Sequence, residues 1–183
     1  MRVIGGEFRS RVLKSVPGLD VRPTPDRLRE SLFNILAPRI AGVVFADFYA
    51  GSGAVGIEAL SRGAAHAWFL ERSRPALETI HGNLAALGAE RRSTVVPGAV
   101  VRTLPQQRAQ IVFLDPPYDL EREYAGAMEV LGEQPPMLVI VQHSVHFELK
   151  PGYGPLIRTR VLRQGDNALS FFEPEAVPES TAV

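Results

Sequence analysis

Short apolar runs alternate with stretches of helical periodicity through the middle of the chain. The apolar runs predict five strands, at residues 43–49, 65–70, 93–96, 110–114 and 137–142. Amphipathic stretches predict helices at about residues 54–62, 74–87 and 122–131. Alternation of this kind predicts a mostly parallel sheet with helices on both faces, which is the doubly wound α/β class.

The two ends of the chain depart from this alternation. Residues 156–162 and 168–172 are joined by Gln-Gly-Asp-Asn without a helix, so they predict a C-terminal antiparallel hairpin that completes a seven-stranded sheet. Near the N-terminus, residues 2–4 and 11–13 flank a Gly-Gly turn and predict a small β-hairpin. Thr24 is expected to cap a helix that opens at Pro25.

The chain is therefore expected to divide into an N-terminal hairpin and helix extension, residues 1–40, and an α/β domain, residues 41–173. The tail at residues 174–183 is rich in Pro, Glu and small residues and is expected to be disordered. No second α/β domain is expected.

Charge and composition narrow the setting. The chain carries twenty basic and twenty acidic side chains, but residues 1–40 hold eight basic against four acidic. This basic block indicates an end that faces a polyanion. The chain has no cysteine and no apolar run of the roughly 20 residues that a membrane span needs. We therefore expect a cytoplasmic protein without disulfides or membrane contact.

A glycine-rich turn follows the first predicted strand. Gly51, Gly53 and Gly56 match the dinucleotide-binding fingerprint, and Glu71 lies twenty positions after Gly51, where an acid would bind ribose hydroxyls. An NAD-dependent oxidoreductase is therefore an open alternative. Asp47 argues against it, because an acid at this strand end would repel a pyrophosphate and suits a ligand with ammonium and sulfonium charges.

The fourth predicted strand runs into Asp115-Pro116-Pro117-Tyr118. An exocyclic base amine is a poor nucleophile, but a carboxylate at Asp115 and the carbonyl of Pro116 can accept both of its hydrogens. The two prolines fix the direction of that carbonyl, because both φ angles are locked. Tyr118 offers a ring on which an extruded base can stack. The motif predicts amine methylation by positioning, without a metal.

These motifs resemble the amino-methyltransferases of class I, Rossmann-like fold, which use S-adenosylmethionine (SAM). Three segments, Ile4–Arg9, Arg22–Asn34 and Tyr49–Gly63, resemble more narrowly the bacterial ribosomal RNA small subunit methyltransferase D family. The resemblance implies a SAM-dependent methyltransferase domain that makes N2-methylguanine in 16S rRNA. It also implies a monomer whose partner is 16S rRNA, the 30S subunit or an assembly intermediate.

The resemblance and the motifs together give three sets of expected site residues. The expected catalytic residues are Asp115, Pro116, Pro117 and Tyr118. The expected SAM-binding residues are Thr24, Arg27, Glu30, Asp47, Tyr49, Ala50, Gly51, Ser52, Gly53, Glu71, Ala99, Val100 and Asp115. The expected RNA-binding residues are Arg2, Arg9, Arg11 and Arg22, as phosphate contacts.

One position departs from related enzymes, which often carry Asp or Asn after the third strand to bind adenine. Residues 96–100 offer no such side chain, so the backbone at Ala99 and Val100 is expected to serve. Two further alternatives stay open: an adenine-N6 methyltransferase acting on DNA or RNA, and a SAM- or RNA-binding module without catalysis. Four scattered histidines indicate no metal site.

Overall fold

The computed structural model describes residues 1–17, 26–100, 109–117 and 121–175. Three of the expected site residues, Arg22, Thr24 and Tyr118, lie outside these ranges, as does most of the expected disordered tail. All other expected site residues lie within them.

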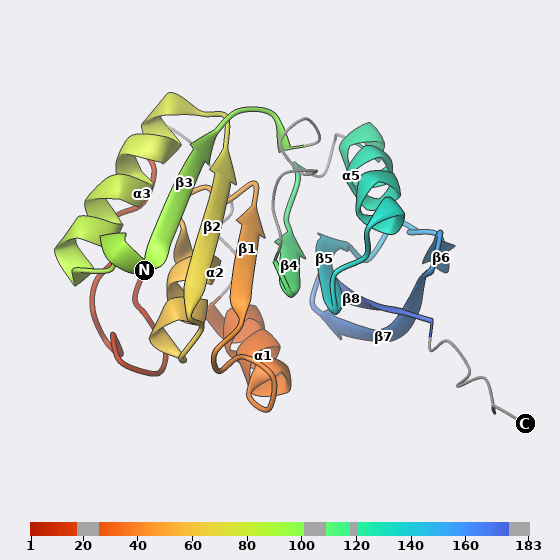
Figure 1. Cartoon of the computed structure of the whole chain (residues 1–183), viewed down its shortest axis with the longest axis horizontal. Helices are drawn as coiled ribbons and strands as arrows, with labels where there is room; N and C mark the ends of the chain where they lie inside the picture. Colours follow the sequence, from red (N-terminus) through yellow and green to blue (C-terminus); the bar gives the residue numbers. More distant parts are fainter. Residues whose placement is uncertain (18–25, 101–108, 118–120, 176–183) are drawn as a thin grey trace, which may run out of the picture.

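The described strands form one eight-stranded sheet in the order β3-β2-β1-β4-β5-β8-β7-β6 (Figure 1). Strands β1 to β5 are parallel, as predicted, and β5, β8, β7 and β6 pair antiparallel. The parallel strands are β1 Val44–Phe48, β2 His66–Glu71, β3 Ser93–Pro97, β4 Ile111–Leu114 and β5 Leu138–Ser144. The remaining strands are β6 Gly152–Tyr153, β7 Leu156–Gln164 and β8 Asn167–Pro174.

Two details differ from the prediction. The sheet has an eighth strand, β6, which is two residues long and pairs with the start of β7. Gly154, at a φ of 58°, makes the tight turn between them, and a two-residue strand is too short to leave a periodic signal. The predicted N-terminal hairpin is reduced to one antiparallel bridge between Arg2 and Val12, with hydrogen bonds between the flanking backbones.

Helices cover both faces of the sheet, which confirms the doubly wound class. They are α1 Asp26–Leu36, α2 Ala54–Ser61, α3 Arg74–Leu87 and α5 Glu121–Glu133, with a short 3-10 helix η1 at Glu90–Arg92. Apolar side chains of α1, such as Leu32, pack with Ile140 of β5, whereas α5 buries Met128 against Val141 from the other face. All four residues of β4 are buried, because both of its faces are covered.

The chain changes direction across the sheet between β1 and β4. From β1 it moves outward through β2 and β3, then returns to β4 on the other side of β1 and continues to β5. In doubly wound sheets ligands bind at this switch, beyond the carboxyl ends of the strands. The glycine-rich turn follows β1, and Asp115 follows β4 at the same edge.

The packing of α2 on β2 generates a stability prediction. A methyl group added at Gly56 would lie 2.8 Å from Cζ of Phe69 and nearer still to Cε1. We expect Gly56→Ala to lower the free energy of unfolding by about 2 kcal/mol, because the ring has to shift. The melting temperature should then fall by roughly 4–8 °C in thermal unfolding.

Gly82→Ala, in α3, is the matched control. A methyl group there meets nothing within 4 Å, so the better helix propensity of alanine should leave stability unchanged or raise it by up to about 1 kcal/mol. Equal melting temperatures for the two variants would contradict the proposed packing of α2 against Phe69.

Candidate functional site

Three acids predicted from the sequence meet at the carboxyl edge of β1, β2 and β4. Asp47, the fourth residue of β1, is 2% exposed. Burial raises its pKa well above the ordinary value, the amide of Gly56 lowers it, and the charges of Asp115 and Glu71 raise it further. Since both acids act on Asp47 through space, the three carboxylates share one electrostatic environment.

The glycine-rich turn is anchored to two of these carboxylates. The amide of Gly56 donates to Oδ2 of Asp47 at 2.8 Å, and the amide of Gly51 donates to Oε2 of Glu71 at 2.9 Å. Gly51 and Gly53 have φ angles of 56° and 78°, a region that favours glycine. A methyl group on Gly51 would meet nothing within 4 Å, so the backbone there borders open space.

Glu71 is held by three backbone amides. Its Oε1 accepts from Arg72 and Ser73 at 2.8 Å each, while Oε2 accepts from Gly51. An ionised carboxylate has about four acceptor positions and no donor. Glu71 can therefore accept about one further hydrogen bond, which must come from a ligand that donates, such as a sugar hydroxyl.

Two neighbouring residues of α5, Glu123 and Tyr124, hold the segments that follow β1 and β4. The hydroxyl of Tyr49 donates to Oε2 of Glu123 at 2.5 Å. The hydroxyl of buried Tyr124 donates to the carbonyl oxygen of Pro116 at 3.1 Å. The Tyr124 ring packs on Phe147 with centroids 4.8 Å apart, which fixes its position. One turn of α5 thus fixes two walls of the candidate site.

Tyr49 has a φ of 64°, which is uncommon for a residue other than glycine and costs of order 1–3 kcal/mol. Burial and the hydrogen bond to Glu123 raise the pKa of Tyr49, so its hydroxyl stays protonated and keeps donating. The expectation that Tyr49 lines the site came from its position after β1. No motif marks Glu123 or Tyr124, and the sequence interpretation missed both.

The structure adds a partner to one expected catalytic group. The carbonyl of Pro116, expected to accept an amine hydrogen, already accepts the Tyr124 hydroxyl. A carbonyl oxygen has two lone pairs, so one remains for a substrate. The positions of four other expected cofactor residues are as follows: Arg27 and Glu30 are exposed on α1, Ala99 is exposed after β3, and Val100 is buried in the core.

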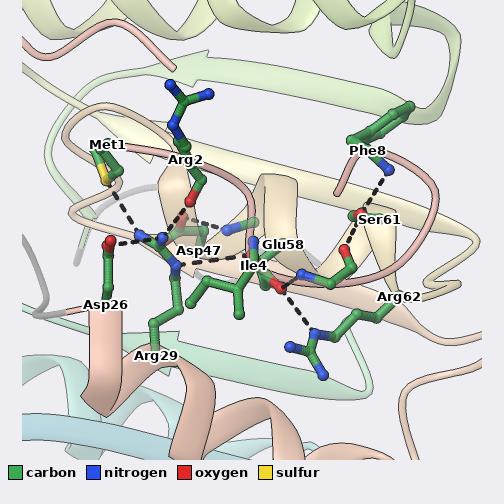
Figure 2. Close-up of polar contacts among 12 residues, drawn as sticks. Met1, Arg2, Ile4, Phe8, Asp26, Arg29, Asp47, Glu58, Ser61 and Arg62 are labelled. Atoms are coloured by element: carbon green, nitrogen blue, oxygen red, sulfur yellow. Dashed lines mark hydrogen bonds and ion pairs between the residues drawn. The ribbon is translucent and has the colours of Figure 1, made fainter. Parts of the chain in front are cut away.

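A second buried carboxylate, Glu58, joins α2 to the N-terminal segment (Figure 2). Its oxygens accept from the amides of Ile4 and Gly5 at 2.8 Å each and from Nε of Arg62 at 2.8 Å. Nε of Arg29, on α1, lies 3.8 Å from Oε2 of Glu58. Both Arg29 and Glu58 are fully buried, so this pair fixes the N-terminal segment between two helices. The sequence interpretation assigned neither residue a role.

Arg29 also reaches the chain start, and this determines how the predicted RNA contacts are presented. Its guanidinium donates to the carbonyl of Arg2 at 2.6 Å and to Asp26 at 3.0 Å. The guanidinium of Arg2 itself donates to the carbonyl of Ser10, and that of Arg11 donates to Ala86 at the end of α3. The side chains of Arg2 and Arg11 are exposed, but their hydrogen bonds to backbone carbonyls hold them along the protein surface.

The tip of the N-terminal segment lies at the amino edge of the sheet, away from the three acids. The amides of Glu7 and Phe8 donate to the carbonyl and hydroxyl of Ser61, the last residue of α2. Helix α2 starts at the carboxyl end of β1 and runs back toward its start, which places Ser61 at the opposite edge. Arg9 follows directly after this tip.

Within residues 1–17, 26–100, 109–117 and 121–175, no group of three metal-ligating side chains forms a metal site. Over the same ranges, the longest helices are too short or too polar to cross a bilayer. What the described site offers a ligand is carboxylate oxygens and the remaining lone pair of the Pro116 carbonyl.

Comparison with known proteins identifies the family. A family model described as conserved hypothetical protein 95 matches residues 1–173. Ribosomal RNA small subunit methyltransferase D of Escherichia coli (strain K12) is 44% identical over 120 residues, which are 64% of this chain and 60% of that protein. YlbH of Bacillus subtilis (strain 168), provisionally named an rRNA methyltransferase, is 33% identical over 182 residues, covering 94% of this chain and 98% of YlbH.

Solved structures agree. The structure of yhhF from Escherichia coli, provisionally named a methyltransferase, superposes with a TM-score of 0.81 at 36% identity, over 97% of this chain and 99% of that one. An RNA methyltransferase from Salinibacter ruber, solved with S-adenosyl-L-homocysteine, shares the fold at a TM-score of 0.62 and 16% identity, over 88% and 99% of the two chains. The chain therefore belongs to the family described as conserved hypothetical protein 95, and its resemblance to the ribosomal RNA small subunit methyltransferase D family is confirmed.

Proposed function

We propose that this protein is a SAM-dependent methyltransferase that methylates the exocyclic N2 amine of a guanine in 16S rRNA. The observation that carries the proposal is the meeting of Asp115-Pro116 with the glycine-rich turn and Glu71 at one sheet edge. The names of two relatives, one matched over nearly its whole length and one over part of it, support rRNA as the substrate class. The partner is 16S rRNA or a small subunit containing it, met by a monomer in the cytoplasm.

The described residues fit SAM. When bound, SAM supplies a methyl group made electrophilic by a sulfonium. Glu71 would accept a ribose hydroxyl at its remaining acceptor position, and the Gly51 backbone leaves room for the ligand. The acids Glu71 and Asp115, beside the buried Asp47, favour a ligand with ammonium and sulfonium charges and disfavour a pyrophosphate. This is the specific argument against a dinucleotide in the same fold.

Asp115 and Pro116 would hold the amine. The carboxylate of Asp115 accepts one N–H, and the free lone pair of the Pro116 carbonyl accepts the other, which aims the nitrogen lone pair away from both. The hydroxyl of Tyr124 donates a hydrogen bond to the same carbonyl oxygen and so holds it in place. Most of the rate then comes from orientation of the nucleophile. Tyr118, outside the described residues, remains the proposed stacking surface for the base.

The direct test is transfer of labelled methyl from SAM to small ribosomal subunits from cells that lack this modification, followed by nucleoside analysis. We expect the label in N2-methylguanosine. Label in N6-methyladenosine would replace the base specificity by the adenine alternative. Absence of transfer to subunits, to naked rRNA and to DNA, with SAM bound, would favour a binding module without catalysis.

Asp115→Ala should impair methyl transfer, whereas Glu71→Ala should impair SAM binding. Asp115→Ala removes the amine acceptor and one of the acids that favour a cationic cofactor, so methyl transfer should fall at least about 100-fold while the Kd for SAM rises by no more than about threefold. Glu71→Ala removes a charged acceptor for the ribose, worth about 1.5–3 kcal/mol, so the Kd for SAM should rise roughly 10- to 150-fold. Calorimetric SAM titration and single-turnover transfer measure the two effects, and a crossed pattern would contradict the assigned roles.

Tyr124→Phe should separate orientation of the acceptor carbonyl from folding. Loss of the hydroxyl frees the Pro116 carbonyl from its support, and we expect kcat to fall roughly 5- to 50-fold, about 1–2.3 kcal/mol, with the KM for SAM unchanged. Tyr153→Phe is the control, because that hydroxyl accepts from the amide of Lys150 beside β6, away from the carboxyl ends of β1 and β4. Equal loss of kcat in both variants would refute a positioning role for Tyr124.

A further inference from the structure

Strand β7 carries three arginines, Arg158, Arg160 and Arg163, and no acidic residue. We name these three the β7 rim. Arg160 and Arg163 are exposed, and neither takes part in the ion pairs found among the described residues. Arg158 is half-buried and donates to the carbonyl of Leu149 at 3.2 Å. Beyond the two-residue β6, β7 is the edge of the described sheet (Figure 1).

The register places Arg163, the last arginine of the rim, level with the carboxyl ends of β4 and β5, where the candidate site lies. Arg160 and Arg158 precede it along β7, level with Phe113 and Val112 of β4. Leu114 of β4 pairs with Val141 of β5, Val141 with Ser170 of β8, and Ser170 with Val161 of β7. Neighbouring strands lie about 4.8 Å apart, so Val161 is about 14 Å from Leu114. By the same register Arg163 shares a row with His143 of β5, two residues beyond Val141 and level with the motif after β4.

The charge of the site explains why such a rim is needed. The proposed reaction brings the target base to Asp115, and the acids Asp115 and Glu71 would repel the phosphates on either side of that base. The RNA backbone therefore has to be held by cations beside the site. A distance of about 14 Å corresponds to roughly four stacked nucleotides at a rise of about 3.4 Å.

Side chains alternate between the two faces of a sheet along a strand, so Arg160 and Arg163, three residues apart, lie on opposite faces. Arg163 is opposite Ala168, whereas Arg160 is opposite Phe171, three residues away along β8. The bulge between Arg158 and Arg160 adds a residue to β7 and turns it further. A phosphate chain that crosses the edge would thus meet a guanidinium on each side, whereas the tip of the N-terminal segment lies at the other edge of the sheet.

We propose that the β7 rim binds the phosphate backbone of the RNA strand that flanks the methylated guanine. The inference rests on the proposed function and adds to it a surface formed by the C-terminal hairpin. These are contacts that position the strand, so they should raise affinity for RNA without reading its sequence. The competing explanation is that the arginines only guard an exposed strand edge against pairing with another chain.

The test compares full-length Arg160→Gln/Arg163→Gln with the wild-type chain. The probe is a 16S rRNA transcript, and the Kd is measured over a series of salt concentrations. Each guanidinium that no longer neutralises a phosphate should lower the slope of log K against log salt by about 0.7–0.9, so the slope of the double variant should be smaller by about 1.4–1.8. Affinity near physiological salt should fall about tenfold, with SAM affinity and melting temperature unchanged.

Arg163→Gln and Arg91→Gln form the matched single pair. Arg91 is an exposed arginine of η1, at the amino edge of the sheet beside β3, so its replacement changes the net charge equally but lies away from the site. We expect Arg163→Gln to lower the salt slope by about 0.7–0.9 and Arg91→Gln to leave it unchanged. Equal effects of the two substitutions, or no effect of the double variant, would overturn the proposal and leave the rim as an edge guard.

Methyl transfer by the wild-type chain to small ribosomal subunits is measured in parallel. If the wild type transfers methyl and the rim variants keep full RNA affinity and salt slope, the rim proposal fails alone. If the wild type neither binds the transcript nor transfers methyl, the proposed function fails, and the rim loses its RNA ligand with it.

Discussion

The gathering of three acidic side chains at the carboxyl edge of β1, β2 and β4 is the constraint that shapes the rest of this protein. Asp47 is almost fully buried, and the carboxylates of Asp115 and Glu71 act on it, so isolated charges there would be costly. Backbone amides stabilise two of these acids: the amide of Gly56 donates a hydrogen bond to Asp47, and the amide of Gly51 donates one to Glu71. The same charge favours a cationic ligand and keeps phosphates outside, which links the proposed cofactor, the proposed reaction and the position of the β7 rim.

A second carboxylate solves the same problem for a structural purpose. Glu58 is buried and accepts two backbone amides and the guanidinium of Arg62, with Arg29 close by (Figure 2). Breaking such a buried pair by removing one partner is costly, because the other charge stays unpaired. Helix α2 therefore has one end in the glycine-rich turn and the other in the contact that holds the N-terminal segment.

Helix α5 plays the corresponding part on the other face. Its neighbours Glu123 and Tyr124 reach the segments after β1 and β4, so a single turn sets the spacing of the two loops between which a base would enter. The left-handed backbone of Tyr49 is compatible with this role, since a strained residue persists only where its surroundings hold it. The site thus lies at the carboxyl ends of the parallel strands, and helix α5 fixes two of the segments that follow those strands.

The sequence by itself determined the element order, the parallel sheet with its C-terminal hairpin, the family and the meeting of the glycine-rich turn with Glu71. Those features rest on local periodicity and on short motifs whose residues are close together in the sequence or follow predicted strands. Only the tertiary structure decided that Glu58 pairs with Arg29, that Tyr124 supports Pro116, and that Arg163 of β7 lies level with the motif after β4. It also added β6 and reduced the N-terminal hairpin to one bridge. These depend on contacts between distant segments, which leave no periodic signal because each partner alone is an ordinary residue of its own helix or strand.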